Sequence, residues 1–277
     1  MSDNQLMKSN LPQVQEAEMS FLEHLEELRW HLIRSFAAIA VISVLAFLSK
    51  SFVFDTLILS PKSADFLTYK AFCGLSEALQ MSDMLCFQPV AFEVINLEMM
   101  GQFLIHLKVA VIIGFILAFP YFFWEMWRFI SPGLNKEEAQ YSRAIVTASS
   151  LLFMAGVSFG YFVLSPFSIN FFASYTISPT VTNTIALASY ISIITTLVLA
   201  SGIMFELPIV VYFLSKLGLV TPQVMRQHRK HALVVILLVA AVITPADIAS
   251  QILVSIPVYF LYEISIFVSA TVAPKGV

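Results

Sequence analysis

Three acidic side chains fall within or between long apolar stretches of the chain. Glu206 lies in SGIMFELPIVVYFLS, Glu263 in QILVSIPVYFLYEISIFVSA, and Asp247 in the turn TPADIAS that separates two apolar segments. A charged side chain at the middle of a bilayer costs about 3 kcal/mol on insertion scales, so such groups usually turn inward, pair or carry function. Each of the three acids therefore requires a polar partner.

The surroundings of these acids suggest structural partners. Glu206 lies two residues before Pro208, and Ser, Thr or Gln251 from neighbouring helices could satisfy its carboxylate through hydrogen bonds. Asp247 precedes an apolar run and fits the N-terminal cap of a helix. Glu263 lies near the end of its apolar run, where water or a basic residue can reach it.

A second group of acids belongs to the N-terminal segment SFLEHLEELRWHLIRSF. Ser20 and Glu23 have the spacing of a capping box, which predicts a helix near residues 19–34. Apolar residues recur at helical spacing on one face, whereas Glu23 and Glu27 occupy another and Arg29 follows them. Acids near the positive end of a helix are ordinary, so a solvated helix explains this pattern without any further function.

The elements that must position these acids are membrane-spanning helices. The chain is 58% hydrophobic and 12% charged, against about a quarter charged residues in soluble proteins, so we expect an all-α integral membrane protein with a single domain. Six segments reach or approach the length of a transmembrane helix, near residues 32–54, 103–124, 144–167, 185–214, 231–244 and 248–270. The fifth is only about 21 Å long as a helix, which predicts a thinned bilayer or burial against neighbouring helices.

Proline and glycine mark local features within these segments. Pro208 and Pro257 fall inside the fourth and sixth segments, and each should bend its helix because it removes a backbone hydrogen bond. Gly156 and Gly160 form a G-x-x-x-G pattern in the third segment. This pattern predicts a face that packs closely against another helix of the same chain.

Basic residues indicate the orientation of the chain. Eleven of the fifteen Lys and Arg residues lie in the N-terminus, the 125–143 loop, the 215–230 loop and the C-terminal tail, so we expect both termini in the cytoplasm. The inner end of the second segment is aromatic and fits an interfacial belt, formed by Tyr121, Trp124, Trp127 and Phe129.

The longest connection, residues 55–102, is then extracytoplasmic. It holds both cysteines, Cys73 and Cys86, and the oxidising side of the membrane permits a disulfide between them. Closing the loop of about 14 residues between the two cysteines would stabilise the fold by about 3 kcal/mol in the chain-entropy model. Two free thiols are the alternative.

Several separated motifs resemble one family. The run FLEHLEELRWHL is similar to the F-x-x-H-L-x-E-L-R-x-R-L signature of TatC, the receptor subunit of the twin-arginine protein translocase. Ser60-Pro61, WRFISPGLNKEE, FELP, TPADIASQ and IPVYFLYE follow in the order of the family's later motifs. Two positions depart from the pattern: His31 replaces a second basic residue, and Ala139 and Gln140 follow Glu138 where basic residues are frequent.

The resemblance implies a cup-like receptor, in the bacterial inner membrane, that binds signal peptides with two consecutive arginines. The receptor would export folded cargo using the proton-motive force, form oligomers, contact lipid, and work with single-span TatA- and TatB-type subunits. No catalytic group, cofactor, metal or nucleic acid is implied. The resemblance assigns peptide binding to Glu27 and Glu138, with support from His24, Arg29 and Phe129.

Carboxylates are chemically suited to recognise the arginines of a signal peptide. A guanidinium is a planar fork that forms two parallel hydrogen bonds with a carboxylate, which an ammonium group does not.

For Glu206 and Gln251 the resemblance adds a second interpretation, a polar patch that docks the transmembrane helix of a partner. Interhelical polar contacts in lipid average about 0.6 kcal/mol, so such a patch would set register more than affinity. Pro61 and Asp247 would shape loops.

Two other classes of membrane protein fit the sequence less well. An intramembrane protease requires a nucleophile with a base, paired aspartates or the zinc motif H-E-x-x-H, and the His and Glu residues of the N-terminal segment lack that spacing. A small-solute transporter often contains inverted repeats; residues 1–140 and 141–277 show none, although the two prolines leave broken helices open. The sequence contains no P-loop, so direct ATP hydrolysis is not expected.

Overall fold

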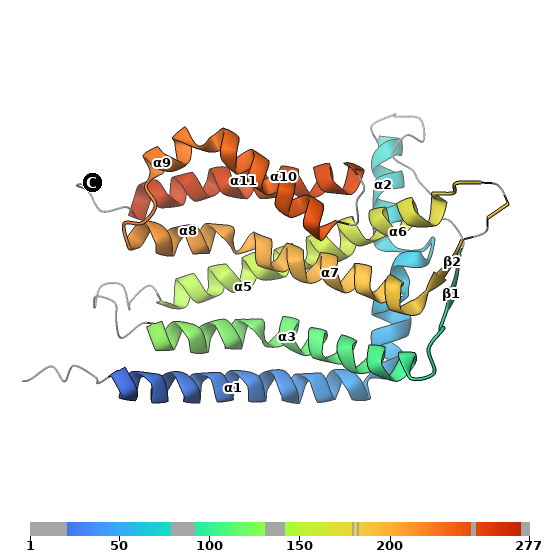
Figure 1. The fold of residues 1–277 in the computed structure, drawn as a ribbon, viewed down its shortest axis with the longest axis horizontal. Helices are drawn as coiled ribbons and strands as arrows, with labels where there is room; N and C mark the ends of the chain where they lie inside the picture. The colour runs from blue at the N-terminus through green and yellow to red at the C-terminus, as the bar shows by residue number, and fades with distance from the viewer. Residues whose placement is uncertain are drawn as a thin grey trace, which may run out of the picture.

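The computed structural model describes residues 21–78, 92–130, 142–178, 180–181, 183–244 and 248–272. Within these ranges the chain is helical apart from short connections and one pair of strands (Figure 1). The helices are α1 (Phe21–Leu48), η1 (Phe52–Ile58), η2 (Ser60–Lys62), α2 (Leu67–Ala78), α3 (Gly101–Ile130), α5 (Ser142–Phe159), η4 (Gly160–Leu164), α6 (Ser165–Ser174), α7 (Leu187–Phe205), α8 (Leu207–Lys216), α9 (Pro222–Gln227), α10 (Arg229–Ile243) and α11 (Ile248–Val272). The strands are β1 (Glu93–Ile95) and β2 (Thr184–Ala186). The expected helical membrane fold is confirmed.

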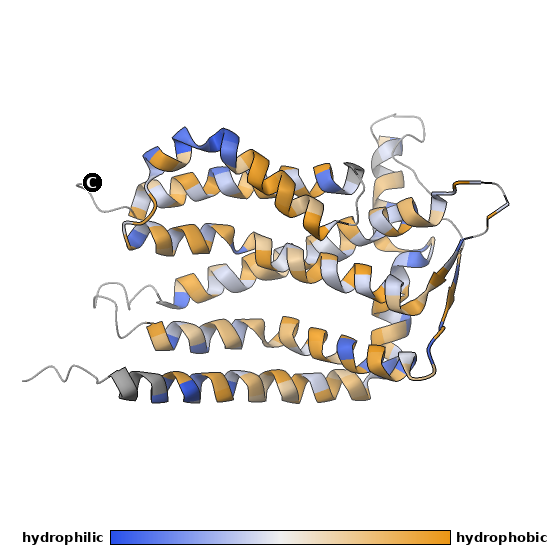
Figure 2. Ribbon diagram, in the orientation of Figure 1, coloured by the Kyte–Doolittle hydropathy of each residue, from blue (hydrophilic) through white to orange (hydrophobic). Residues whose placement is uncertain are grey.

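Five helical segments are long and apolar enough to cross a membrane, and they run side by side in Figure 1. They cover Glu26–Leu48, Gly101–Ile130, Arg143–Ser174, Leu187–Lys216 and Ser250–Val272. Hydrophobic residues dominate their lengths, whereas hydrophilic residues gather around α9 and the start of α10 (Figure 2). The expected fifth span is α10, whose 15 residues give about 22 Å of helix. A sixth crossing stays a prediction because α10 is shorter than the other five.

The predicted N-terminal helix and the first span form one continuous helix. α1 extends from Phe21 to Leu48 without a break and packs mainly against α3. Its first turns are therefore a rigid extension of the span. In Figure 1, α1 lies at the edge of the bundle, and its first turns lie beside the end of α3. We call the end of the bundle where α1 begins and α3 and α8 end the N-terminal face.

The fourth span is interrupted at an acidic residue. α7 ends at Phe205, Glu206 occupies a turn, and α8 begins at Leu207. Pro208 lies in the first turn of α8, where its missing N–H is tolerated because the first amides of a helix have no intrahelical partner. The sequence predicts a bend at Pro208, and the structure has the boundary between α7 and α8 just before it. Pro257, by contrast, lies inside α11, which continues through it.

A short parallel strand pair was not predicted from the sequence. Glu93 pairs with Thr184 and Ile95 with Ala186. β2 leads directly into α7, and β1 precedes α3 with a short connection between them; the two helices run in the same direction in Figure 1. The two lead-in segments therefore lie parallel, and their backbone groups pair at the end of the bundle opposite the N-terminal face.

The main hydrophobic core lies between η1, α3 and α7. Its central residues are almost completely buried and include Val53, Val109, Tyr190 and Ile194. The Tyr190 hydroxyl donates a 3.0 Å hydrogen bond to the carbonyl of Ile58, so the one polar atom of this large side chain is satisfied. This bond ties the connection after α1 to the fourth span.

The connection between the first two spans is anchored at Pro61. This proline is buried in η2, and the Tyr69 hydroxyl donates a 3.1 Å hydrogen bond to its carbonyl. Burial raises the pKa of Tyr69 to about 12, so the hydroxyl keeps its proton and remains a donor. Cys73 on α2 is disulfide-bonded. Its predicted partner, Cys86, lies outside the described residues, and the pairing stays a prediction.

Candidate functional site

A buried acid at the N-terminal face links the two helices that meet there. Glu125 lies on α3 and is 1% exposed. Its Oε2 lies 2.5 Å from Nδ1 of His31 on α1, and its Oε1 accepts a 2.9 Å hydrogen bond from the Tyr121 hydroxyl. Arg128 approaches the same Oε1 at 3.5 Å. Glu125 therefore has polar partners on both α1 and α3, which offset the cost of burying a carboxyl group.

His31 connects this buried acid to the surface. Its Nε2 lies 4.0 Å from Oε1 of Glu27, one helical turn earlier, whose side chain is 38% exposed. The ring of Phe129 meets the His31 ring edge-on, with centroids 6.3 Å apart. Two residues assigned to peptide binding, Glu27 and Phe129, thus lie on either side of the histidine that replaces a basic residue in the signature.

The other residues assigned to peptide binding are less fully placed. Arg29 lies on α1 and is exposed. His24 lies in the first turns of α1, and its side chain is outside the described part of the chain. Glu138 is outside the described residues, so its distance from Glu27 stays a prediction.

Glu206 has an internal partner in the third span. Ser149 on α5 donates a 2.8 Å hydrogen bond to Oε2 of Glu206, in agreement with the expectation of a Ser or Thr partner. The second oxygen, Oε1, is buried and has no hydrogen-bond partner among the described residues. A half-satisfied buried carboxylate retains an open position for one further donor.

Gln251 does not provide that donor. Its Nε2 instead donates a 3.0 Å hydrogen bond to the carbonyl of Leu237, which links α11 to the neighbouring helix α10. Of the alternative partners expected for Glu206 (Ser, Thr or Gln251), the structure has the serine, whereas Gln251 lies at the start of α11 and satisfies the α10 backbone there. Asp247, the predicted helix cap, is outside the described residues.

Glu263 is paired with a basic residue on a neighbouring helix, as its place near a span end suggested. Arg229 at the start of α10 donates from Nη2 to Oε2 of Glu263 at 2.8 Å. Both side chains are partly exposed. The pair joins α10 to α11 and requires no functional interpretation.

The predicted aromatic belt is only partly formed. Trp124 is exposed and stacks beneath the guanidinium of Arg128, 5.6 Å from the ring centroid. Trp127, however, is 3% exposed and packs against Phe213 of α8, with centroids 5.3 Å apart. On a helix that packs on both sides, Trp127 points inward, so its assignment to the belt was wrong.

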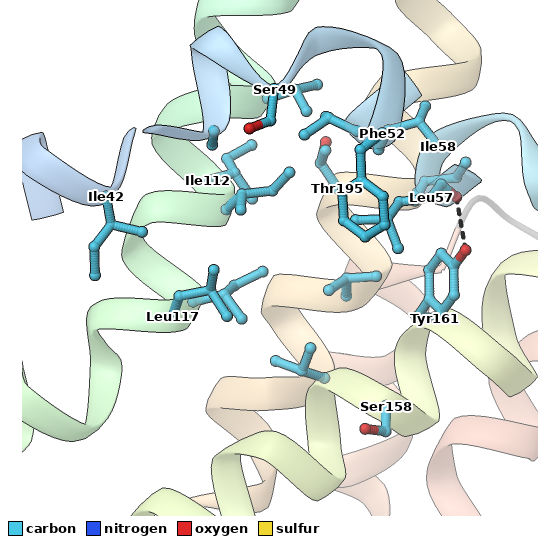
Figure 3. A pocket seen from close by; sticks show the side chains of 18 of the residues that line it. Ile42, Ser49, Phe52, Leu57, Ile58, Ile112, Leu117, Ser158, Tyr161 and Thr195 are labelled. Atoms are coloured by element: carbon cyan, nitrogen blue, oxygen red, sulfur yellow. Dashed lines mark hydrogen bonds between the residues drawn. The ribbon is translucent and has the colours of Figure 1, made fainter. Parts of the chain in front are cut away.

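An apolar cavity of about 560 Å³ lies between α1, η1, α3, η4 and α7. Figure 3 shows Ile42, Ile112 and Leu117 on its walls, with Tyr161 at one side donating a hydrogen bond to the carbonyl of Leu57. Glu206 is not among the lining residues. This cavity and the polar site at Glu206 are thus separate features.

Sequence reasoning missed Glu125. The stretch YFFWEMWRF was read as an aromatic belt, and the single acid within it was passed over. A signal was present: Tyr121 and Arg128 lie four residues before and three residues after Glu125, which places all three on one helix face. The distant partner His31 could not have been found by spacing within one helix.

Comparisons with known proteins agree with the motifs. The family model described as Sec-independent protein translocase protein (TatC) matches residues 23–257. A Sec-independent protein translocase protein TatC from Blattabacterium sp. subsp. Periplaneta americana is 42% identical over 93% of this chain and 97% of its own length. The corresponding protein from Aquifex aeolicus is 33% identical over 93% of this chain and 97% of its own length.

Solved structures show the same fold. A crystal structure of a twin-arginine translocase receptor, TatC, aligns with a TM-score of 0.65 and 31% identity, and covers 90% of this chain and 99% of that one. A second crystal structure of a TatC receptor, in the detergent DDM, aligns with a TM-score of 0.67 and 33% identity. Motifs, helical architecture and both kinds of comparison therefore agree, and the chain belongs to the TatC family as a multi-pass membrane component of a Sec-independent protein translocase.

Proposed function

We propose that this chain is the receptor for twin-arginine signal peptides and the core subunit through which folded cargo is exported. The observation that carries the proposal is the position of Glu27. Its carboxylate is 38% exposed at the N-terminal face and lies beside His31, which in turn contacts Phe129. A partly dehydrated carboxylate binds a guanidinium more strongly than a fully solvated one does.

Glu138 completes the proposed site from the loop after α3. One carboxylate for each arginine would account for recognition of a consecutive pair, since each guanidinium takes a bidentate partner. The N-terminal face would then be cytoplasmic, in the inner membrane, with both chain termini on that side. The energy source implied by the resemblance is the proton-motive force.

Crosslinking of a photoreactive twin-arginine signal peptide tests this proposal. Glu27→Gln and Glu138→Gln keep the shape of each side chain and remove its charge, so each should weaken crosslinking by about tenfold, the cost of about 1.4 kcal/mol of binding. Glu263→Gln is the matched control because it removes an acid that pairs with Arg229 between α10 and α11. Unchanged crosslinking in both test variants would contradict the proposal.

A second proposed function is the docking of a single-span TatA- or TatB-type subunit at Glu206. The support is the free buried oxygen Oε1, since the hydrogen bond from Ser149 uses only Oε2. A polar side chain on the partner helix would supply the missing donor. Glu206→Ala should reduce crosslinking between this chain and the partner, whereas intact crosslinking and export would leave Glu206 with a structural role alone.

A further inference from the structure

The buried pair between His31 and Glu125 is not used by the function proposed above. It joins α1 to α3 through a 2.5 Å contact between His31 Nδ1 and Glu125 Oε2. Both side chains are almost completely buried, at 6% and 2% exposed. A polar pair at this depth must be well matched in geometry, because both groups have left water.

Four described side chains lie against the pair. Tyr121 and Arg128 face Glu125 from α3, and Glu27 faces His31 from α1. Phe129 covers the histidine ring from one side. Glu125 therefore has three donors around it, and His31 lies between two carboxylates, one buried and one partly exposed.

The position of α1 makes this pair important for Glu27. α1 packs mainly against α3 and lies at the edge of the bundle in Figure 1. Contacts with α3 therefore set the distance between its first turns and the end of α3. His31 is one turn from Glu27, so a contact that holds His31 against α3 also fixes the place and direction of the Glu27 carboxylate.

We propose that Glu125 and His31 are positioning residues that hold the carboxylate of Glu27 in the orientation needed to bind an arginine of the signal peptide. This inference rests on the proposed receptor function. It also gives a role to the departure in the N-terminal signature, since His31 contacts the buried acid Glu125 from the position where the signature has a second basic residue.

Orientation of Glu27 should affect arginine more than lysine. A guanidinium forms two parallel hydrogen bonds with one carboxylate and therefore needs a fixed direction, whereas an ammonium is a compact charge with rotatable donors. A loosened Glu27 still attracts positive charge but no longer distinguishes the two groups. The ratio of affinities for an Arg-Arg and a Lys-Lys peptide thus reports positioning and does not depend on how much protein is folded.

The test measures this ratio for the full-length protein in detergent, with synthetic signal peptides that carry Arg-Arg or Lys-Lys. We expect Glu125→Ala and His31→Ala each to lower the ratio by about tenfold, in line with the loss of a charge-assisted hydrogen bond. His31→Arg keeps a basic partner for Glu125 and should stay within about twofold of the parent ratio. Should the alanine variants fail to accumulate, Glu125→Gln with His31→Gln provides a neutral hydrogen-bonded pair that tests the charge alone.

Matched controls separate this inference from the receptor function. Arg229→Ala and Glu263→Ala break another interhelical ion pair, with a 2.8 Å contact, and should leave the ratio unchanged. If Glu27→Gln weakens Arg-Arg binding while the His31 and Glu125 variants keep the parent ratio, the positioning role is overturned and the receptor function stands. If Glu27→Gln leaves Arg-Arg binding unchanged, the positioning role fails, and the receptor function fails with it only if Glu138→Gln also leaves that binding unchanged.

Discussion

At the scale of single residues, the acids inside this protein have clearly different partners. Glu125 is surrounded by three donors, Glu263 has one arginine, and Glu206 has one serine with its second oxygen unsatisfied. Glu206 differs from the other two because its second oxygen is buried and lacks a donor among the described residues. Such an oxygen suits the proposed docking of a partner helix.

Ser149→Ala tests how much Glu206 depends on its internal bond. The substitution leaves both oxygens of a partly buried carboxylate without a donor among the described residues, so the free energy of unfolding should fall by about 1–3 kcal/mol. Thermal unfolding in detergent measures this change. Ser150→Ala on the next position is the control, because its hydroxyl only bonds the carbonyl of Val146 in its own helix; an equal loss in both variants would contradict a specific role for Ser149.

At the scale of elements, the close approach of α5 and α7 depends on glycine. A Cβ added at Gly156 would lie 2.5 Å from the carbonyl oxygen of Ser201 and 2.9 Å from the Cα of Gly202. One added at Gly160 would lie 2.8 Å from the carbonyl oxygen of Leu197. All three contacts are to backbone, which has little freedom to move, so the predicted close-packing face of the third span is confirmed.

Gly156→Ala should therefore separate the two helices. The expected loss in stability is about 1–3 kcal/mol, the usual cost of overpacking a core, measured by thermal unfolding in detergent. Gly74→Ala on α2 is the matched control, since a Cβ there meets nothing within 4 Å, and it should be neutral or slightly stabilising because alanine favours helix. Equal stability of the two variants would contradict the packing role of Gly156.

The sequence predicted the long helices well because their apolar length is a local property. The effect of Pro208 on the fourth span is local too, because a proline lacks the backbone N–H of a helix interior. The β1–β2 pair and the partners of Gln251 and Trp127 were not, since each depends on segments far apart in the chain. Glu125 was missed on the same ground: its main partner, His31, lies on another helix.

At the scale of the whole molecule, the crossing of α10 decides the topology. Six crossings would place both termini on one side, whereas the five longest segments alone would place them on opposite sides. Arg229 and Lys230 begin α10, and Thr244 follows its end. The rest of α10 is largely apolar. Basic residues at one end of an apolar helix favour the cytoplasmic side for that end.

Labelling with a membrane-impermeant maleimide tests this arrangement. Cysteines introduced at Gln227, before α10, and at Ala246, after it, should react from opposite sides of the membrane in intact cells and inverted vesicles. The parent chain is the background control, because its Cys73 is disulfide-bonded and does not react with a maleimide. Reaction of both introduced cysteines from the same side would show that α10 does not cross.

The central claim is that acids at the N-terminal face recognise a pair of guanidinium groups, which ammonium groups replace poorly. The most direct test is export of a folded reporter in cells whose sole TatC-type protein is this chain with its partner subunits. Replacing the arginine pair of the signal peptide by two lysines should lower export by at least about tenfold, because bidentate pairing is lost. Equal export with arginines and lysines would contradict the claim.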